Sequence, residues 1–236
     1  MKTKLSARSS PATSITCNPI SIYQNQENMN TKTTLITICV VITISSRLRG
    51  AATNTSVVVD LDGNQLQANT KYYILPTRHG GGGLALSIRD RRDPCPPNVM
   101  QETDGASVGL SLKIFPADGK AEIDLQSDLN LAFMAATICV QRTVWRLGES
   151  DWSTGRRYVR SDGVVGRPGA ETVRNWFKIE GSGQGYKIVY CPSVCSACRV
   201  ECGVVGVYVE NGRRWLALGG QPLFIAFKKG NHSSWN

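Results

Sequence analysis

The strongest constraint on the fold is a succession of short apolar or alternating runs between residues 57 and 227, separated by Gly, Asp and Asn. No segment in this region sustains the period of an amphipathic helix. Short runs at close spacing with turn residues between them are typical of β-sandwiches and β-barrels. The sequence therefore predicts an all-β domain of about a dozen strands. The expected strands lie near residues 57–59, 71–75, 84–88, 110–115, 121–126, 129–133, 143–147, 158–159, 175–180, 186–190, 204–209, 214–218 and 223–227.

Residues 29–52 have the organisation of a signal peptide. Lys32 supplies a basic flank, residues 34–45 form an apolar run, and small residues follow at Gly50-Ala51-Ala52. The run is shorter than the ~20 residues that cross a bilayer as a helix. Its β-branched residues also suit a buried strand, but the order of the three features favours a signal peptide. For the polar residues 1–28 three interpretations stay open: an over-extended reading frame upstream of Met29, a disordered leader or a transit peptide.

We therefore expect a leader over residues 1–28, a signal peptide over 29–52 and one folded domain over 53–236. The mature protein is expected to be secreted, with the vacuole as an alternative destination, and to have no membrane attachment once the signal is removed. Asn54-Thr-Ser and Asn231-His-Ser are N-glycosylation sequons. Asn54 and Asn231 flank the predicted domain, where a glycan is tolerated.

The number of cysteines supports a secreted location. Of the eight cysteines, Cys17 and Cys39 precede the domain, and six lie within it. An even number in a secreted protein predicts three disulfides, and six cysteines permit 15 pairings, so the count leaves the connectivity open. Four cysteines within residues 191–202 also resemble a zinc site, but their crowding and an oxidising compartment favour disulfides. The six are Cys95, Cys139, Cys191, Cys195, Cys198 and Cys202.

The composition argues against several function classes. The formal net charge is +9, but residues 1–50 hold six Lys or Arg and one Glu, so the remainder carries +4. That charge predicts a solvated surface and no nucleic-acid partner. His79 and His232 stand beside no nucleophile, and Gly80–Gly83 lacks the Lys-Ser/Thr of a phosphate-binding loop. We expect no enzyme activity, no cofactor and no metal.

The first expected hairpin carries a specific pattern. From Val58 to Ile74 the chain reads V-x-D-x-D-G-N-x-L, five residues, then Y-Y-I, and Asp-Gly-Asn is suited to a tight turn. This pattern resembles the signature that opens plant Kunitz-type proteinase inhibitors. Further stretches are similar to the miraculin-like branch of that family, and the resemblance covers residues 57–228. These stretches are Ser127–Phe133, Thr143–Leu147, Ser153–Gly155, Trp176–Glu180 and Cys191–Cys195.

The resemblance implies a single β-trefoil domain of 12 strands, stapled by Cys95–Cys139 and Cys191–Cys202. It also implies the short Cys195–Cys198 bridge of the miraculin-like branch. In that branch a further cysteine, just before the strand leading to Cys191, joins two chains. Residues 180–186 contain no cysteine. We therefore expect a monomer without an interchain disulfide.

In this family, inhibition comes from an exposed loop between the fourth and fifth strands. The loop enters a protease cleft like a substrate and is held rigid, so that little ordering entropy is lost on binding. The resemblance places Lys120 as the specificity residue for a serine endopeptidase of trypsin type and Lys120–Ala121 as the reactive bond. The loop comprises Phe115, Pro116, Ala117, Asp118, Gly119, Lys120, Ala121 and Glu122.

Other features of the sequence keep alternatives open. Gly119 loosens the backbone, and the asparagine that braces the loop in the family corresponds to Ala68, with Asn69 one place on. The leading hypothesis is a secreted serine-proteinase inhibitor in plant defence. The second is a miraculin-like defence or storage protein with little or no inhibitory activity. The third is a carbohydrate-binding trefoil, which needs aromatic residues clustered in exposed pockets, whereas most aromatic residues here lie in expected strands.

Overall fold

The computed structural model describes residues 57–139 and 143–230. The leader, the signal peptide, His232 and the sequons at Asn54 and Asn231 lie outside these residues, so the predictions about them remain predictions. Within the described part of the chain, no helix is long and apolar enough to cross a membrane.

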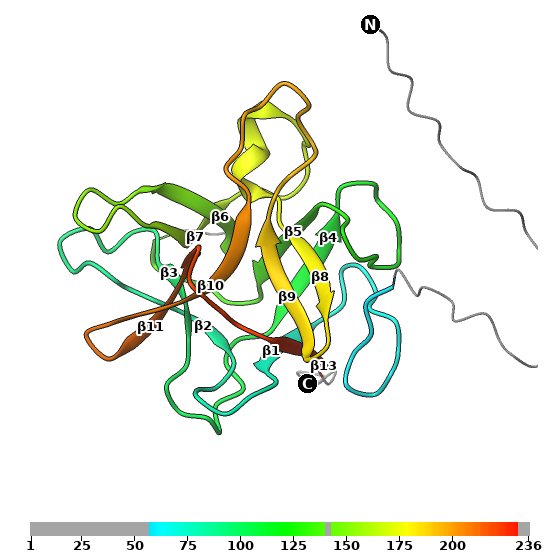
Figure 1. Cartoon of the computed structure of the whole chain (residues 1–236), viewed down its shortest axis with the longest axis horizontal. Helices are drawn as coiled ribbons and strands as arrows, with labels where there is room; N and C mark the ends of the chain where they lie inside the picture. The colour runs from blue at the N-terminus through cyan, green and yellow to red at the C-terminus, as the bar shows by residue number, and fades with distance from the viewer. Residues whose placement is uncertain (1–56, 140–142, 231–236) are drawn as a thin grey trace, which may run out of the picture. The chain divides into compact units, whose positions relative to one another are not determined.

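Short strands dominate the described residues, which form thirteen strands and one 3-10 helix, η1 (Ala170–Asn175) (Figure 1). This content confirms the all-β prediction. The strands are β1 (Tyr72–Pro76), β2 (Leu84–Ser87), β3 (Asn98–Gln101), β4 (Leu112–Pro116), β5 (Leu129–Phe133), β6 (Thr143–Ser150), β7 (Arg157–Gly163), β8 (Lys178–Ser182), β9 (Gly185–Tyr190), β10 (Gly203–Glu210), β11 (Arg213–Leu218), β12 (Gln221–Pro222) and β13 (Ile225–Lys229).

The strand pairings form a closed circuit. It runs from β1 through β4, β5, β6, β7, β11, β10, β9 and β13, and β13 pairs with β1 over five positions. All of these pairings are antiparallel. A closed circuit leaves no long unpaired edge, because each strand of the circuit has a neighbour on both sides. The loops between paired strands therefore project from a fixed barrel.

Two expected strands are absent, and two unexpected strands, β3 and β12, are present. Residues 57–59 and 121–126 make only isolated bridges, Val57 with Asp124, Val59 with Gln65 and Gln67 with Glu122. The second stretch ends in a turn at Gln126, which has a φ of +62°. The pattern missed β3, whose four residues are all buried, so that no polar alternation marks it as a strand.

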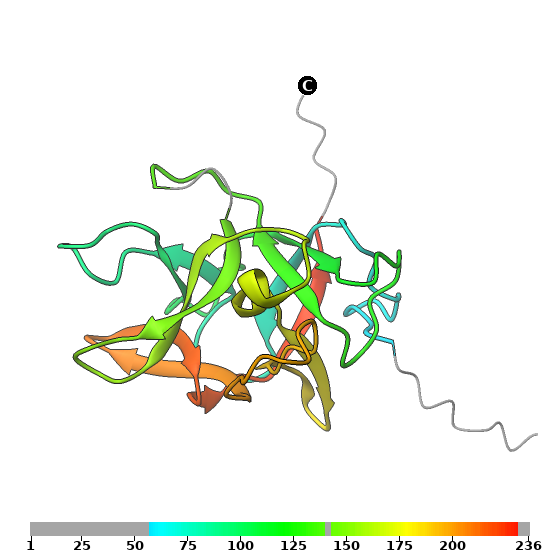
Figure 2. The same ribbon diagram turned by 90° about the horizontal axis from the view of Figure 1, so that it is seen from above.

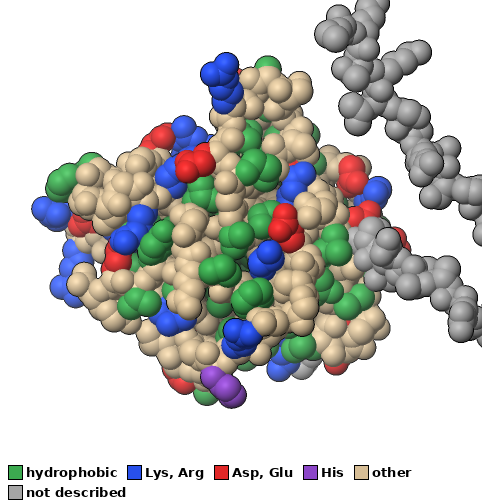
Figure 3. Space-filling view, viewed as in Figure 1, with side chains coloured by type: hydrophobic (Ala, Val, Ile, Leu, Met, Phe, Trp, Pro, Cys, Tyr) green, Lys and Arg blue, Asp and Glu red, His purple; other side chains and the backbone are tan. Residues whose placement is uncertain are grey.

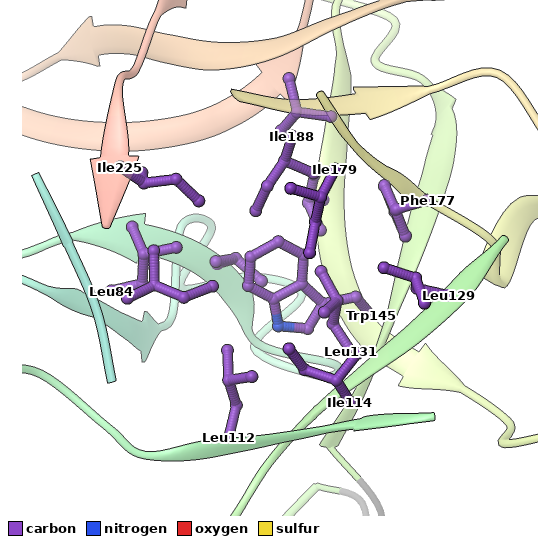
Figure 4. Packing of buried hydrophobic residues seen from close by; sticks show 14 of the residues in the cluster. Leu84, Leu112, Ile114, Leu129, Leu131, Trp145, Phe177, Ile179, Ile188 and Ile225 are labelled. Carbon is purple, nitrogen blue, oxygen red and sulfur yellow. The ribbon is translucent and has the colours of Figure 1, made fainter. Parts of the chain in front are cut away.

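Trp145 on β6 lies in the middle of the barrel core. Its side chain is fully buried, and Figure 4 shows the indole surrounded by aliphatic side chains from several strands. Ring contacts extend the cluster, with centroid distances of 5.6 Å to Phe133 and 5.9 Å to Phe177. A single large side chain thus contacts elements from several parts of the chain. Its neighbours in Figure 4 include Leu84, Leu112, Ile114, Leu131, Ile179 and Ile188.

Three disulfides staple the domain, in the pairs that the resemblance implies: Cys95–Cys139, Cys191–Cys202 and Cys195–Cys198. The alternative of a four-cysteine zinc site is wrong, because all four sulfurs between residues 191 and 202 are bonded to one another in pairs. Each bridge restricts the unfolded chain, and removing such a bond from a small secreted domain costs about 2–5 kcal/mol.

We predict that Trp145→Ala lowers the free energy of unfolding by about 3–5 kcal/mol, because it removes a fully buried indole and leaves a cavity. The matched control is Trp152→Ala, since Trp152 is 90% exposed and its loss is expected to change stability by less than about 0.5 kcal/mol. Urea unfolding of the oxidised protein measures both. Equal losses in the two variants would contradict the central position of Trp145.

Candidate functional site

The loop between β4 and β5, residues 117–128, projects from the barrel beside the segment 57–70 that precedes β1. Both views show the two next to each other (Figures 1 and 2). We call residues 57–70 the supporting segment. All eight residues predicted to form the reactive loop fall at the end of β4 or in this loop, and residues 118–122 are exposed.

A tight turn shapes the first half of the loop. The Ala117 amide donates to the Asp128 carbonyl at 2.8 Å, and the Gly119 amide donates to the Pro116 carbonyl at 3.3 Å. Gly119 has a φ of +70°, a conformation that glycine adopts without steric cost. The glycine is therefore what the turn requires, and it places Lys120 at the exposed edge of the loop.

Backbone hydrogen bonds anchor the chain on the other side of Lys120. The Ala121 carbonyl accepts from the Ala68 amide at 2.6 Å. Two residues later, the Ile123 amide donates to the Leu66 carbonyl at 3.0 Å, and the Ile123 carbonyl accepts from the Val58 amide at 3.0 Å. The Ile123 side chain is fully buried in the core. The predicted reactive bond, Lys120–Ala121, therefore lies directly before a pinned strand-like stretch.

The residues of the opening signature hold the supporting segment itself. The Tyr72 hydroxyl accepts from the Gln67 amide at 3.0 Å, and the Tyr186 hydroxyl on β9 accepts from the Val59 amide at 2.9 Å. Asp60 is buried, and its carboxylate accepts from the amides of Asp62 and Asn64 at 3.0 and 2.9 Å, which closes the turn. The signature thus builds the platform on which the loop rests.

The asparagine next to the expected bracing position does not reach the loop. Asn69 has a φ of +58°, its amide donates to the Ile114 carbonyl, and its side-chain oxygen accepts from Lys113 Nζ at 2.9 Å. The brace at this place is instead the backbone amide of Ala68. Sequence reasoning found the position but could not find this main-chain contact.

Lys120 folds back onto its own loop. Its Nζ lies 2.9 Å from the Asp124 carboxylate and 3.3 Å from that of Asp118, and its amide donates to Asp118 at 3.1 Å. The hydrogen bond to Asp124, followed by that to Asp118, raises the pKa of the Lys120 ammonium. The hydrogen bond from the Lys120 amide lowers the pKa of Asp118. The Lys120 side chain is 59% exposed, so these pairs are open to solvent and to competing carboxylates.

The end of the loop is tied to the disulfide-closed segment. Asp128 accepts from the Ser193 amide at 3.1 Å and lies 3.6 Å from Lys178 Nζ. Ser193 lies between Cys191 and Cys195, within the segment closed by the Cys191–Cys202 disulfide. This disulfide therefore helps to position the donor of the Asp128 hydrogen bond. The loop is thus fixed at its base by a second, separate part of the fold.

Comparison with known proteins assigns this arrangement to a family. Residues 58–229 match the legume Kunitz family model, described as trypsin and protease inhibitor. The chain belongs to the plant Kunitz family. Relatives in this family include protease inhibitors, and membership of the family agrees with the expectation that the protein is not an enzyme.

Named relatives include inhibitors and a miraculin. The Kunitz protein is 43% identical over 182 residues to miraculin from Synsepalum dulcificum, covering 73% of this chain and 82% of that protein. It is 40% identical over 184 residues to Kunitz trypsin inhibitor 5 from Arabidopsis thaliana, covering 77% and 90%. The solved Kunitz-type cysteine protease inhibitor from potato is 30% identical with a TM-score of 0.64, covering 75% and 98%. These likenesses confirm the β-trefoil prediction.

Other candidate residues of the Kunitz protein lie outside the loop. His79 is exposed in the turn after β1, and within the described residues its ring forms no hydrogen bond to a Ser, Thr or Cys side chain. Among the described tryptophans, Trp145, Trp176 and Trp215 are buried, as expected for strand residues, and Trp152 is exposed. A single exposed tryptophan in the described part is not the aromatic cluster that the carbohydrate hypothesis requires.

We predict that Tyr72→Phe loosens the supporting segment, because it removes the acceptor of the Gln67 amide. Stability is expected to fall by about 1 kcal/mol, the net value of one hydrogen bond. Hydrogen exchange of the Gln67 amide is expected to accelerate. Tyr73→Phe is the matched control, since no hydrogen bond of the Tyr73 hydroxyl is present among the described residues. Unchanged exchange at Gln67 in Tyr72→Phe would contradict the platform.

Proposed function

We propose that this protein is a secreted monomeric inhibitor of trypsin-type serine endopeptidases, active in plant defence, with Lys120–Ala121 as the reactive bond. One observation carries the proposal: an exposed lysine lies between a glycine turn and a stretch pinned by backbone hydrogen bonds. A loop restrained on both sides loses little conformational entropy when it enters a cleft. A long cationic side chain is what a specificity pocket ending in a carboxylate accepts.

The family match supports the partner class, because named relatives include trypsin inhibitors. The predicted signal peptide supports secretion, and the absence of cysteine in residues 180–186 supports a monomer. The closed disulfides suit an oxidising compartment, where the loop would meet extracellular proteases.

A second function is favoured by one observation, the pairing of Lys120 with its own loop. Binding in a protease pocket requires the ammonium to leave Asp124 and Asp118. Breaking these two ion pairs offsets part of the gain from the pocket carboxylate and weakens inhibition. This feature supports the alternative of a miraculin-like defence or storage protein with little or no inhibitory activity.

We predict that Lys120→Ala abolishes trypsin inhibition, because alanine cannot reach the carboxylate at the bottom of the pocket. The matched control is Lys113→Ala on the adjacent strand, whose ammonium binds Asn69 and not the loop. Titration of trypsin and chymotrypsin with the oxidised protein measures inhibition. Inhibition that survives Lys120→Ala would move the site elsewhere, and no inhibition by well-folded wild-type protein would favour the miraculin-like function.

We predict that Asp124→Asn strengthens trypsin inhibition by about two- to fivefold, the range expected for releasing one exposed ion pair. Asparagine keeps the size of the side chain while removing the charge that holds Lys120. Asp62→Asn changes the net charge equally at an exposed position and is the matched control. An equal gain in both variants would mean that net charge, and not release of Lys120, sets the affinity.

A further inference from the structure

A small cavity lies where the turn after β1, the end of β3, the middle of β10, the start of β11 and residues 221–224 meet. Its volume is about 220 Å³, and its lining contains cationic and amide side chains but neither Asp nor Glu. Figure 3 shows Lys and Arg side chains near the histidine at the lower edge of the face in view. The polar lining residues are Arg78, His79, Gln101, Arg214 and Gln221.

Strand pairing brings these residues together on a rigid base. Arg214 on β11 and Gln101 on β3 are direct cross-strand partners, so their side chains lie on the same face. On the other side, the Thr77 amide donates to the Phe224 carbonyl at 2.9 Å, which fixes the turn carrying Arg78. Strand pairing and this hydrogen bond therefore assemble the cavity from five separate segments of the chain.

Gln101 contributes its side-chain amide to the cavity lining. The residue is only 1% exposed, and its Oε1 accepts from Arg214 Nε at 2.8 Å. With the oxygen oriented by Arg214, Nε2 has no hydrogen-bond partner among the described residues. The NH2 group of this amide is therefore available to donate to a ligand acceptor in the cavity.

The two arginines carry charge that no acidic side chain in the described part neutralises. The guanidinium of Arg78 lies over the Phe224 ring, 5.4 Å from its centroid, and that of Arg214 contacts Gln101. Elsewhere in the domain, Arg89 and Arg156 form ion pairs with Glu210. The cavity thus differs from those sites in keeping a net positive charge and free guanidinium donors.

The glycine run belongs to this region. Gly81 has a φ of +143°, and a Cβ there would lie 2.7 Å from the Glu102 carbonyl and 2.8 Å from Gln101 Nε2. Glycine lets the backbone pass close to the strand end without displacing the Gln101 amide. Close packing next to the cavity therefore explains a glycine in the run Gly80–Gly83, which matches no phosphate-loop motif.

We propose that this cavity binds one oxyanion group, a phosphate or a sulfate. Guanidinium groups bind such anions through paired N–H donors, and Gln101 Nε2 and the His79 ring add further N–H donors. The volume is below the ~300–1,000 Å³ of pockets that enclose drug-sized ligands, so the cavity suits one anionic group and not a whole organic molecule. The group can come from a free ion or from a sulfated polysaccharide. The site is independent of the Lys120 loop.

The test uses the full oxidised protein titrated with sodium phosphate and sodium sulfate, with sodium chloride at equal ionic strength as the baseline. Calorimetry measures affinity, and ¹⁵N NMR follows the side-chain amide of Gln101. We expect saturable binding and a specific shift of the Gln101 amide. No phosphate or sulfate binding at millimolar concentration, together with no binding of heparin, would overturn the proposal.

The decisive variant is Arg78→Gln/Arg214→Gln, expected to weaken anion binding at least about tenfold through loss of two charged donors. Arg213→Gln is the matched control, because it removes a charge from the same strand while Arg213 contacts Ser87 outside the cavity. Heparin binding that is lost only in the double variant supports the site with a polymer as the source. Equal losses of anion binding in the control and the double variant, with unchanged circular dichroism, would overturn the proposal. Such a result would mean that the anion binds through unspecific charge attraction.

Discussion

The pairing of β1 with β13 is the constraint on which the rest of the fold depends. Five consecutive residue pairs, from Tyr72 with Lys229 to Pro76 with Ile225, join the two ends of the domain and close the circuit of strands. The Leu61 amide extends the contact by donating to the Phe227 carbonyl at 2.9 Å. Closure brings Tyr186 on β9 and Tyr72 on β1 to the supporting segment. The loop that carries Lys120 thus owes its position to contacts made at both ends of the domain.

The sequence predicted best those parts of the structure in which the residues present have a single common structural role, such as forming a turn. The opening signature predicted a tight turn, and the structure gives Asp60 and Tyr72 defined hydrogen-bonding roles there. Prediction from alternating polar and apolar residues missed β3, which is buried on both faces. It also predicted a strand at residues 121–126, where only isolated bridges form. Periodicity records which side chains are buried, and it does not record whether a neighbouring strand is available to complete a ladder.

The candidate site was located by resemblance, but its energetics were not. The spacing of Lys120 and Asp124 would indicate an ion pair on a helix, whereas in a loop the same spacing fixes no geometry. The contact depends on the turn at Gly119 and on the pinning of Ile123, which are tertiary facts. The brace from Ala68 is likewise a main-chain contact, and no side chain in the sequence signals it. For the same reason the cavity around Gln101 could not be predicted, since it assembles from five separate segments.

Rigidity and charge act in opposite directions at the Lys120 loop. The backbone anchors restrain the proposed reactive bond at the surface, while Asp124 and Asp118 pair with the Lys120 ammonium. Because the pKa of Lys120 is raised and that of Asp118 is lowered, both groups keep their charge at neutral pH, so a mild change of pH does not release the lysine. The pairs are exposed and screened by salt, whereas a carboxylate inside a protease pocket is shielded from water. A desolvated carboxylate in the pocket attracts the Lys120 ammonium more strongly than the two solvated carboxylates of Asp118 and Asp124 do. The acids of the loop are therefore expected to weaken inhibition and not to prevent it.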